Sequence, residues 1–345
     1  MTSAAMRESD TRSFDPDALR EKYRIERDKR IRADGNDQYV EVSGDFSHYV
    51  DDPYITPGLT RESITRDVEV VIIGGGFGGM LAASRLQQAG IDDFRIIEKA
   101  GDFGGTWYWN RYPGARCDVE SMEYSYSFCE ELQQDWVWTE RFAGQEEILR
   151  YLEHVADRFE LRDDISLETK ALNCEFSETT NLWSVQTTKD NYLAKYCIMA
   201  TGPLSSTNVP DFPGLKDYAG KTYHTGNWPH KKVDFSGETV GIIGTGSSGI
   251  QSTPIVAQQA EHLFVFQRTP SSVDVRANRV TDPEWAANLQ PGWQQERMDN
   301  FNTLVTGGYQ KEDMVGDGWT EIYRNLTGIL PVDGAEQLSN VEIAR

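Results

Sequence analysis

Hydrophobic positions along the chain fall into short runs separated by glycine-rich turns and helical stretches. From Val68 to Ile73 the residues are mostly β-branched, which predicts a buried strand. A glycine-rich turn, a helix over Met80–Ala89 and a second strand over Phe94–Ile97 follow directly. A strand, a helix and a strand within about 30 residues predict a βαβ unit, whose two strands run parallel.

The same order of elements returns further along the chain. A strand is predicted at Glu238–Ile243, a helix at Ile250–Gln259 and a strand at Leu263–Phe266, again with a glycine-rich turn after the first strand. Between the two units an amphipathic helix is predicted from Ile148 to Phe159. Further short strands are predicted near residues 165–169, 182–187 and 192–200. We therefore expect an α/β fold with two Rossmann-like dinucleotide-binding domains, the second incomplete because only two of its strands are visible.

The two ends of the chain differ from this middle part. Residues 1–65 are expected to form a polar extension, with a charged helix over Asp17–Arg32 and a loop over Ser43–Gly58. From Pro270 onward the sequence is polar, helical or irregular and predicts no further strand.

Composition narrows the class of protein. The 345 residues are 38% hydrophobic, 11% aromatic and 26% charged, which is typical of a globular protein. Asp and Glu outnumber Lys and Arg by 55 to 34, so the formal net charge is -21. Such a charge repels phosphate backbones and anionic lipid headgroups, and neither nucleic acid nor a membrane is an expected partner.

No segment predicts a membrane span or a secretory signal. The longest largely apolar run, Val70–Ala83, has 14 residues and five glycines, whereas a membrane helix needs ~20 apolar residues. Met1–Asp17 carries charges and lacks an apolar core. The four cysteines lack CxxC spacing, so we expect no zinc site or disulfide framework, and a cytoplasmic protein. They are Cys117, Cys129, Cys174 and Cys197.

Gly74-x-Gly76-x-x-Gly79 has the spacing that a dinucleotide pyrophosphate requires. The first glycine permits the turn, the second lets backbone N–H groups approach the phosphates, and the third lets the helix pack on the strand. Glu98 stands 24 positions after Gly74, at the end of the second strand. A carboxylate there can accept hydrogen bonds from ribose hydroxyls, so this turn is predicted to bind a dinucleotide with an unphosphorylated ribose.

Gly244-x-Gly246-x-x-Gly249 repeats this spacing. Its second strand ends on Gln267 and Arg268 in place of a carboxylate, and a guanidinium can bind a 2′-phosphate bidentately. We expect this site to prefer NADPH over NADH; the alternative is that Arg268 is a solvated surface residue. Two sites of opposite ribose preference predict hydride transfer from NADPH to a flavin at the first site.

The segment Gly104–Asp118, which reads GGTWYWNRYPGARCD, resembles a fingerprint of the type I Baeyer–Villiger monooxygenases, which are single-chain FAD and NADPH enzymes. A second family fingerprint, Phe-x-Gly-x-x-x-His-x-x-x-Trp-Pro, is present from Tyr218 to Pro229 with tyrosine at its first position. The resemblance covers roughly residues 66–280 and is greatest to the phenylacetone and steroid monooxygenase branch. We therefore expect an FAD-binding domain over residues 66–203 and an NADPH-binding domain, with the start of a helical insertion, over residues 204–345.

By position, the resemblance implies two sets of cofactor contacts. The implied FAD contacts are Gly74, Gly76, Phe77, Gly79, Glu98, Thr106, Trp107, Tyr108, Trp109, Asp118, Tyr124 and Ala171. The implied NADP contacts are Arg116, Cys117, Asp118, Gly244, Thr245, Gly246, Ser247, Ser248, Gly249, Ile250, Gln251, Arg268 and Thr269. Residues 116–118 would lie where the flavin and the nicotinamide meet.

The implied reaction inserts one oxygen atom of O2 next to the carbonyl of a small-molecule ketone and gives an ester or lactone, by way of a C4a-peroxyflavin. In the family, an arginine paired with the fingerprint aspartate stabilises the peroxide anion, so Asp118 would be the orienting carboxylate. The place of His224 in the second fingerprint makes it a further catalytic candidate.

The partner arginine of Asp118 is not found in a matching context in this sequence. The chain is therefore expected to be the N-terminal part of a longer enzyme. Two alternatives to a Baeyer–Villiger monooxygenase stay open, a truncated non-catalytic FAD- and NADP-binding fragment and a flavin N- or S-oxygenase.

Overall fold

The computed structural model describes residues 15–31, 33–40, 42, 48–49, 51–55, 61–268, 273 and 275–327. The chain divides into two compact units, one formed by residues 1–46 with 208–220 and the other by residues 47–207 with 221–345. The first unit contains helix α1 (Pro16–Asp28) and a short antiparallel pair of β1 (Tyr39–Val40) and β8 (Val209–Pro210). The Asp15 carboxylate caps α1 by accepting from two N–H groups of its first turn, and the predicted charged helix is confirmed.

A six-stranded sheet in the order β4-β3-β2-β7-β6-β5 forms the centre of the second unit. Strands β4, β3, β2 and β7 are parallel, and β7, β6 and β5 form an antiparallel meander. The bounds are β2 (Thr65–Ile73), β3 (Phe94–Ile97), β4 (Ile165–Ser166), β5 (Ala171–Ser177), β6 (Leu182–Thr187) and β7 (Asn191–Met199). The parallel βαβ unit predicted from the sequence is confirmed, whereas β4 ends earlier than predicted. Strand β5 is not among the predicted strands, and its apolar Leu172 and Phe176 are exposed.

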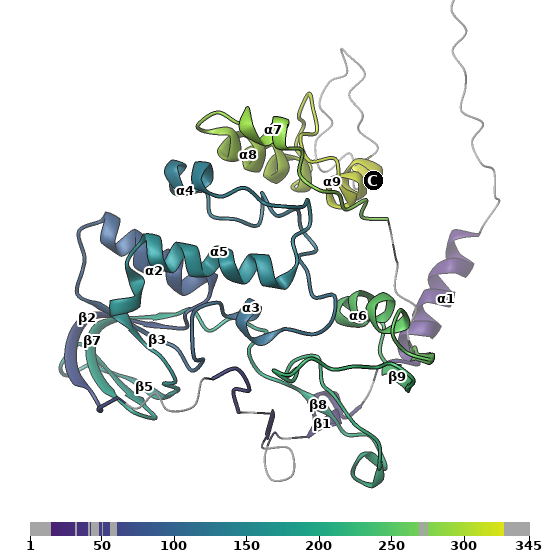
Figure 1. Cartoon of the computed structure of the whole chain (residues 1–345), viewed down its shortest axis with the longest axis horizontal. Helices are drawn as coiled ribbons and strands as arrows, with labels where there is room; N and C mark the ends of the chain where they lie inside the picture. The colour runs from purple at the N-terminus through teal and green to yellow at the C-terminus, as the bar shows by residue number, and fades with distance from the viewer. Residues whose placement is uncertain are drawn as a thin grey trace, which may run out of the picture. The chain divides into compact units, whose positions relative to one another are not determined.

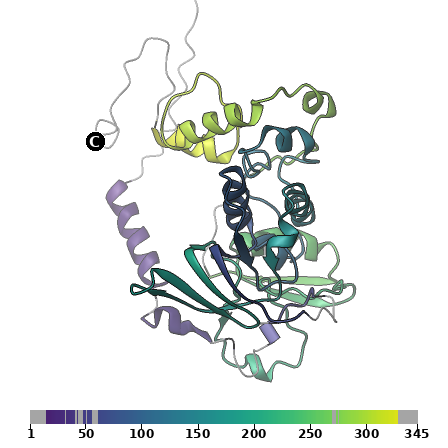
Figure 2. The same ribbon diagram turned by 90° about the vertical axis from the view of Figure 1, so that its left-hand side faces the viewer.

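Helices α2 (Phe77–Gln88) and α5 (Gln145–Arg158) lie side by side over one face of this sheet (Figure 1; Figure 2). From Val70 to Ile73, alternate residues of β2 face the two sides of the sheet, as the period of two in a strand requires. The core on the helical face includes Val70, Ile72, Met80, Phe94, Ile148, Leu152 and Val155. The core on the opposite face includes Val68, Val71, Ile73, Ile97, Val185, Tyr192 and Ala194.

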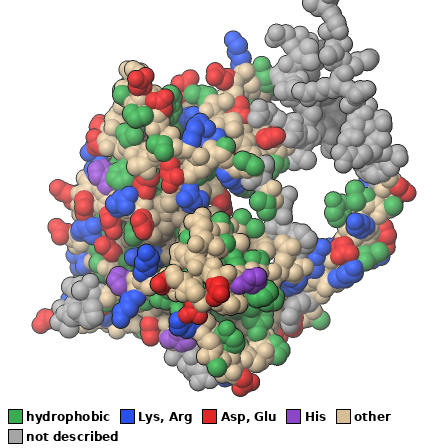
Figure 3. All heavy atoms as spheres, turned by 45° about the vertical axis from the view of Figure 1, so that its right-hand side comes forward, with side chains coloured by type: hydrophobic (Ala, Val, Ile, Leu, Met, Phe, Trp, Pro, Cys, Tyr) green, Lys and Arg blue, Asp and Glu red, His purple; other side chains and the backbone are tan. Residues whose placement is uncertain are grey.

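The second glycine motif lies in another strand–helix–strand unit, formed by β9 (Thr239–Ile243), α6 (Ser247–Ala257) and β10 (His262–Phe266). Strands β9 and β10 pair in parallel, which confirms the second predicted βαβ unit. The remaining helices are α3 (Thr106–Trp109), α4 (Glu130–Asp135), α7 (Pro283–Ala287), α8 (Trp293–Val305) and α9 (Gly318–Thr327). In the described part of the chain, no helix combines the length and apolar character needed to cross a bilayer. Acidic and basic side chains are interspersed on the face shown in Figure 3.

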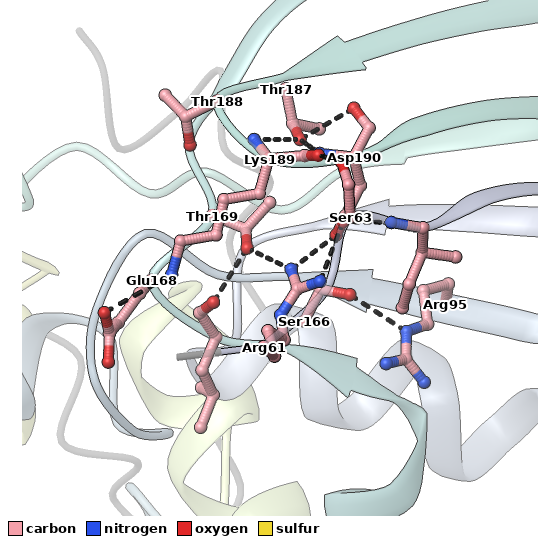
Figure 4. A network of polar contacts seen from close by, with 12 residues as sticks. Arg61, Ser63, Arg95, Ser166, Glu168, Thr169, Thr187, Thr188, Lys189 and Asp190 are labelled. Atoms are coloured by element: carbon pink, nitrogen blue, oxygen red, sulfur yellow. Dashed lines mark hydrogen bonds and ion pairs between the residues drawn. The ribbon is translucent and has the colours of Figure 1, made fainter. Parts of the chain in front are cut away.

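A polar network ties the segment before β2 to the turn between β6 and β7 (Figure 4). The Asp190 carboxylate is fully buried and accepts hydrogen bonds from two nitrogens of the Arg61 guanidinium, at 2.7 and 2.5 Å. It also accepts from the Ile64 N–H and the Tyr192 hydroxyl, each at 2.9 Å. Burial alone would raise the pKa of Asp190, but these donors outweigh it and lower the pKa to about 2.

Replacing Asp190 by asparagine leaves the Arg61 guanidinium without its buried counter-charge, and we expect the free energy of unfolding at pH 7 to fall by about 3 kcal/mol. The folded-state pKa lies below the unfolded value of about 3.9. The charge of Asp190 therefore stabilises the fold at neutral pH, and this contribution is lost as the pH falls from about 4 to about 2. Chemical denaturation at pH 7 and pH 3 measures both effects.

The matched control is Glu69→Gln, which breaks the exposed ion pair between Glu69 and Lys195. This variant is expected to lose less than about 1 kcal/mol. Equal losses for the two variants would contradict a stabilising role of the buried network.

Candidate functional site

The first glycine motif forms the turn between β2 and α2. Gly74 has a φ of 110°, which L side chains rarely adopt, and a Cβ there would lie 2.4 Å from the Ala200 carbonyl oxygen. A Cβ on Gly79 would lie 1.8 Å from the Gly74 carbonyl oxygen. Gly76 is the N-cap of α2 and makes no side-chain hydrogen bond to its first turn. The N–H groups of that turn therefore have the geometry that can accept an anion.

Glu98 directly follows β3 and is buried beside this turn. Its carboxylate accepts hydrogen bonds from the Gly75 N–H at 2.6 Å and the Ala100 N–H at 2.8 Å. Burial raises the pKa of Glu98, and the two N–H donors oppose that shift. The sequence-predicted ribose carboxylate thus lies against the glycine turn.

The first fingerprint, Gly104–Asp118, packs on the same turn. Its first N–H donates to the Gly75 carbonyl oxygen at 3.0 Å, and α3 follows directly. The indole N–H of Trp107 donates to the Tyr124 hydroxyl at 3.0 Å. Three consecutive aromatic side chains of α3 are buried, those of Trp107, Tyr108 and Trp109. The structure therefore brings α3, and through Trp107 also Tyr124, to the first glycine turn.

The second glycine motif, between β9 and α6, repeats the geometry of the first. Gly244 has a φ of 103°, and a Cβ on Gly249 would lie 2.3 Å from the Gly244 carbonyl oxygen. Gly246 is the N-cap of α6 and again makes no side-chain capping hydrogen bond. The two turns thus present the same kind of helix end to a ligand.

Gln267 occupies the position in the second βαβ unit that Glu98 occupies in the first βαβ unit, because each follows the second strand of a parallel pair. Its side-chain amide donates to the Thr245 hydroxyl at 3.0 Å, which ties the end of β10 to the glycine turn. The next residue, Arg268, is exposed. Thr269 lies outside the described residues. The second turn therefore has an amide and a cation where the first has a carboxylate.

Gln251 of α6 contacts the first fingerprint. Its side-chain oxygen accepts from the Tyr112 hydroxyl at 2.9 Å, and its side-chain nitrogen donates to the Arg116 carbonyl oxygen at 3.1 Å and to Asp118 Oδ1 at 2.9 Å. A Cβ on Gly114 would lie 2.4 Å from the Gln251 carbonyl oxygen, so this approach requires glycine. Two predicted NADP contacts, Gln251 and Asp118, are thus brought into direct contact.

The two residues before Asp118 are held by the segment that precedes α5. Arg116 donates to the Phe142 carbonyl oxygen at 3.0 Å and lies 3.6 Å from the Glu140 carboxylate. The Cys117 N–H donates to the Ala143 carbonyl oxygen at 3.0 Å. Burial raises the pKa of the Cys117 thiol to about 12, so the thiol is protonated at neutral pH.

Two other predicted site residues make local contacts. His224 Nδ1 accepts from the Gly226 N–H at 3.0 Å, and the His224 ring lies 5.7 Å from that of Tyr49. Ala171 begins β5 and packs against the core on the face of the sheet opposite the helices. These contacts order the second fingerprint and the meander, respectively.

A buried ion cluster of Glu120, Glu123, Arg141 and Arg297 lies close to Asp118 in the fold. Arg297 of α8 pairs with Glu120, and its Nε lies 2.5 Å from Glu123 Oε1. Arg141 Nε lies 3.2 Å from Glu120 Oε1. The four side chains are between 2% and 10% exposed. This cluster is not predicted from the sequence, because Glu120 and Arg297 are 177 positions apart and their pairing leaves no local signal.

The ion cluster joins the segment that contains α8 and α9 to the loop that carries Asp118. Arg297 also donates to the Met314 carbonyl oxygen, and Arg141 to that of Val315, both at 2.6 Å. The Trp319 indole donates to the Asp118 carbonyl oxygen at 3.3 Å. The Asp118 backbone thus accepts a hydrogen bond from α9, while its carboxylate accepts one from Gln251.

Both glycine turns fit a dinucleotide, because each combines an uncapped helix N-terminus with a close backbone approach of its first and third glycines, which a Cβ on the third glycine would prevent. Among the residues that the structure describes, no group of His, Cys, Asp and Glu side chains could hold a metal ion. The family model for pyridine nucleotide-disulphide oxidoreductases matches residues 71–312, a range that includes both turns and the first fingerprint. The chain belongs to the pyridine nucleotide-disulphide oxidoreductase family.

Two curated proteins and one solved structure are similar to most of this chain. The chain is 44% identical over 333 residues to neopentalenolactone D synthase of Streptomyces avermitilis. The aligned region covers 93% of this chain and 55% of the relative. It is 41% identical over 323 residues to a Baeyer–Villiger monooxygenase of Streptomyces coelicolor, with 91% and 53% covered. The solved polycyclic ketone monooxygenase from Thermothelomyces thermophila has a TM-score of 0.78 at 34% identity, with 88% and 53% covered.

These likenesses confirm the resemblance to Baeyer–Villiger monooxygenases that the fingerprints indicate. The chain spans about half the length of the curated relatives it matches.

Gly79→Ala is expected to destabilise the first turn by about 2 kcal/mol, because its Cβ would meet the Gly74 carbonyl oxygen. The matched control is Gly78→Ala in the same helix turn, where a Cβ would make an ordinary 3.6 Å contact with the Ala200 Cβ. That control is expected to be neutral or slightly stabilising, because alanine favours helix. Thermal unfolding and FAD retention after gel filtration compare the two, and equal behaviour would refute the close-approach argument.

Glu123→Gln tests the ion cluster through its pH dependence. Burial and the neighbouring Glu120 carboxylate raise the pKa of Glu123 to about 8. Because the folded state holds this proton more tightly than the unfolded chain, the contribution of Glu123 to stability is lost as the pH rises from about 4 to about 8. We expect the melting temperature of the variant to gain roughly 3 °C on wild type between pH 6 and pH 9. Glu296→Gln, an exposed change on α8, should show no such gain; a parallel pH profile for Glu123→Gln and wild type would contradict the assignment.

Proposed function

We propose that this chain carries the two cofactor sites of a flavin-dependent Baeyer–Villiger monooxygenase that uses FAD and NADPH to convert a small-molecule ketone and O2 into an ester or lactone. The observation that supports this most directly is the contact between Gln251 and Asp118. It joins the helix of the second glycine turn to the fingerprint packed on the first, and hydride transfer requires the two cofactors to meet.

The first glycine turn is the FAD site in this proposal, within an FAD-binding domain over residues 66–203. The N–H groups at the start of α2 hold the pyrophosphate, and Glu98 accepts hydrogen bonds from the ribose. Helix α3, whose three aromatic side chains are buried, follows the Gly104 N–H that donates to the Gly75 carbonyl oxygen, and we infer that it limits the access of water to the turn.

The second glycine turn is the NADPH site, within a domain over residues 204–345. The start of α6 holds the pyrophosphate, and Arg268 binds the 2′-phosphate. Gln267 stands where a carboxylate would repel that phosphate. The cytoplasmic location that we propose rests on the spacing of the four cysteines, which is not that of a disulfide framework.

The chemistry of the bound cofactors is hydride donation by NADPH and transfer of the electrons to O2 by FAD. The role of this chain is then to hold the two cofactors in a fixed position relative to each other. Gln251 donates to Asp118 and fixes the carboxylate at the junction of the two sites. A carboxylate fixed there orients a cationic group that stabilises negative charge on the reacting oxygen.

Arg268→Ala is expected to raise the dissociation constant of NADP+ by about 10- to 100-fold, since a charge-assisted contact to the 2′-phosphate is lost. The dissociation constant of NAD+, which lacks that phosphate, should change less than about twofold. Calorimetric titration of the FAD-loaded chain measures both. Lys232→Ala, another exposed cation, is the control and should leave both constants unchanged; equal weakening of the two nucleotides by Arg268→Ala would refute its role.

The function itself is tested on the purified chain by three measurements, namely flavin absorbance, NADPH consumption, and product formation from cyclic, aryl and steroid ketones. A yellow protein that consumes NADPH and forms an ester or lactone supports the proposal. A flavin-loaded protein that oxidises amines or sulfides and no ketone would instead support an N- or S-oxygenase. Cofactor binding without any turnover would support a non-catalytic cofactor-binding fragment.

A further inference from the structure

Residues 51–55, called here the strap, contact the first fingerprint although they belong to the part of the sequence without visible chemistry. The Asp52 carboxylate accepts hydrogen bonds from the Tyr108 hydroxyl at 2.9 Å and from the Gly101 N–H at 3.0 Å. The Tyr54 ring meets the Tyr108 ring edge-on, with centroids 5.7 Å apart and planes at 87°. The strap is therefore joined to the helix that packs on the first glycine turn.

Arg111, a cation of the first fingerprint, adds to the contact between the strap and α3. The Arg111 guanidinium lies 3.9 Å from the centroid of the Tyr54 ring and 4.8 Å from that of Tyr108. Its Nε donates to the Tyr108 carbonyl oxygen at 2.8 Å, which fixes the side chain over both rings. Cation–π contacts of this kind favour a single orientation of the Tyr54 ring.

The other side of the strap reaches the end of the second fingerprint. The Tyr54 hydroxyl donates to the Trp228 carbonyl oxygen at 2.6 Å. The Asn227 side-chain amide donates to the Asp51 carbonyl oxygen at 3.2 Å, and the His230 ring lies 6.0 Å from that of Tyr54. One tyrosine thus contacts both fingerprints, with its ring on the first and its hydroxyl on the second.

We propose that Tyr54 is a positioning residue, which sets the second fingerprint against the first and thereby aligns the NADPH unit with the FAD unit. This inference rests on the proposed function. The second fingerprint lies in the segment that leads from the first βαβ unit to β9, so a tie at Trp228 restrains the chain before it enters the second βαβ unit. Hydride transfer depends steeply on alignment, so loosening this tie should slow the reaction more than it weakens cofactor binding.

The first test measures the tie itself, without any turnover. Tyr54→Phe keeps the ring and its contact with Arg111 but removes the hydroxyl donor to Trp228. Amide hydrogen exchange in the peptide covering residues 221–232 is expected to accelerate about fivefold in this variant. Tyr309→Phe, at an exposed tyrosine elsewhere in the chain, is the matched control and should exchange like wild type. Unchanged exchange in Tyr54→Phe would overturn the proposal.

The second test measures the reaction. With FAD bound and oxygen excluded, the rate of flavin reduction at saturating NADPH should fall roughly five- to tenfold in Tyr54→Phe. The NADPH dissociation constant and the FAD content should stay within about twofold of wild type, a split that a general loss of structure would not produce. Asp52→Ala releases the strap from the first fingerprint and should lower the same rate. A reduced rate fully explained by weaker NADPH binding, or no change in rate, would overturn the positioning role.

The two tests separate this inference from the function on which it rests. If NADPH does not reduce the flavin of the wild-type chain, the proposed function fails. Hydrogen exchange then still decides whether Tyr54 ties the two fingerprints together.

Discussion

The close approach of the first and third glycines of each turn is the constraint on which the two nucleotide-binding units depend. A Cβ on Gly79 or Gly249 would lie within 2.3 Å of the carbonyl oxygen of the glycine five positions earlier. Without that approach, the helix could not begin where the strand ends, and its N-terminal N–H groups would not face the space beyond the sheet. The glycines thus act through backbone packing, and the ligand-binding character of each turn is a consequence of it.

A close backbone approach at a glycine also joins the two βαβ units. Gly114 allows the first fingerprint to approach the backbone of α6, and at that distance the Gln251 side chain reaches Tyr112, Arg116 and Asp118. A single amide with both a donor and an acceptor can satisfy backbone and side-chain groups together. The joint is therefore specific in orientation, which a purely hydrophobic contact would not ensure.

Much of this arrangement could be predicted from the sequence, because it is encoded locally. Strand, glycine turn and helix follow one another in both units, and Glu98 and Gln267 take their places from the strand register alone. The ion cluster around Arg297 and the contact of Tyr54 with Trp228 could not be predicted in this way. Their partners lie 177 and 174 positions apart, and an isolated arginine or tyrosine in a polar segment has no periodicity that would reveal a buried partner.

The two βαβ units also show that the backbone geometry of a glycine turn does not depend on how deeply its flanking strands are buried. Strands β2 and β3 are buried on both faces, whereas Ile243, Phe264 and Phe266 of β9 and β10 are more than half exposed. The turns nevertheless have the same glycine conformation, with φ values of 110° and 103° at their first glycines. Because the second turn keeps this geometry with little burial of its own strands, its shape is set by the glycine spacing and by the packing of α6 against the first fingerprint. The placement of the second nucleotide site therefore depends on contacts outside its own sheet, and the joint at Gln251 and the strap at Tyr54 supply such contacts.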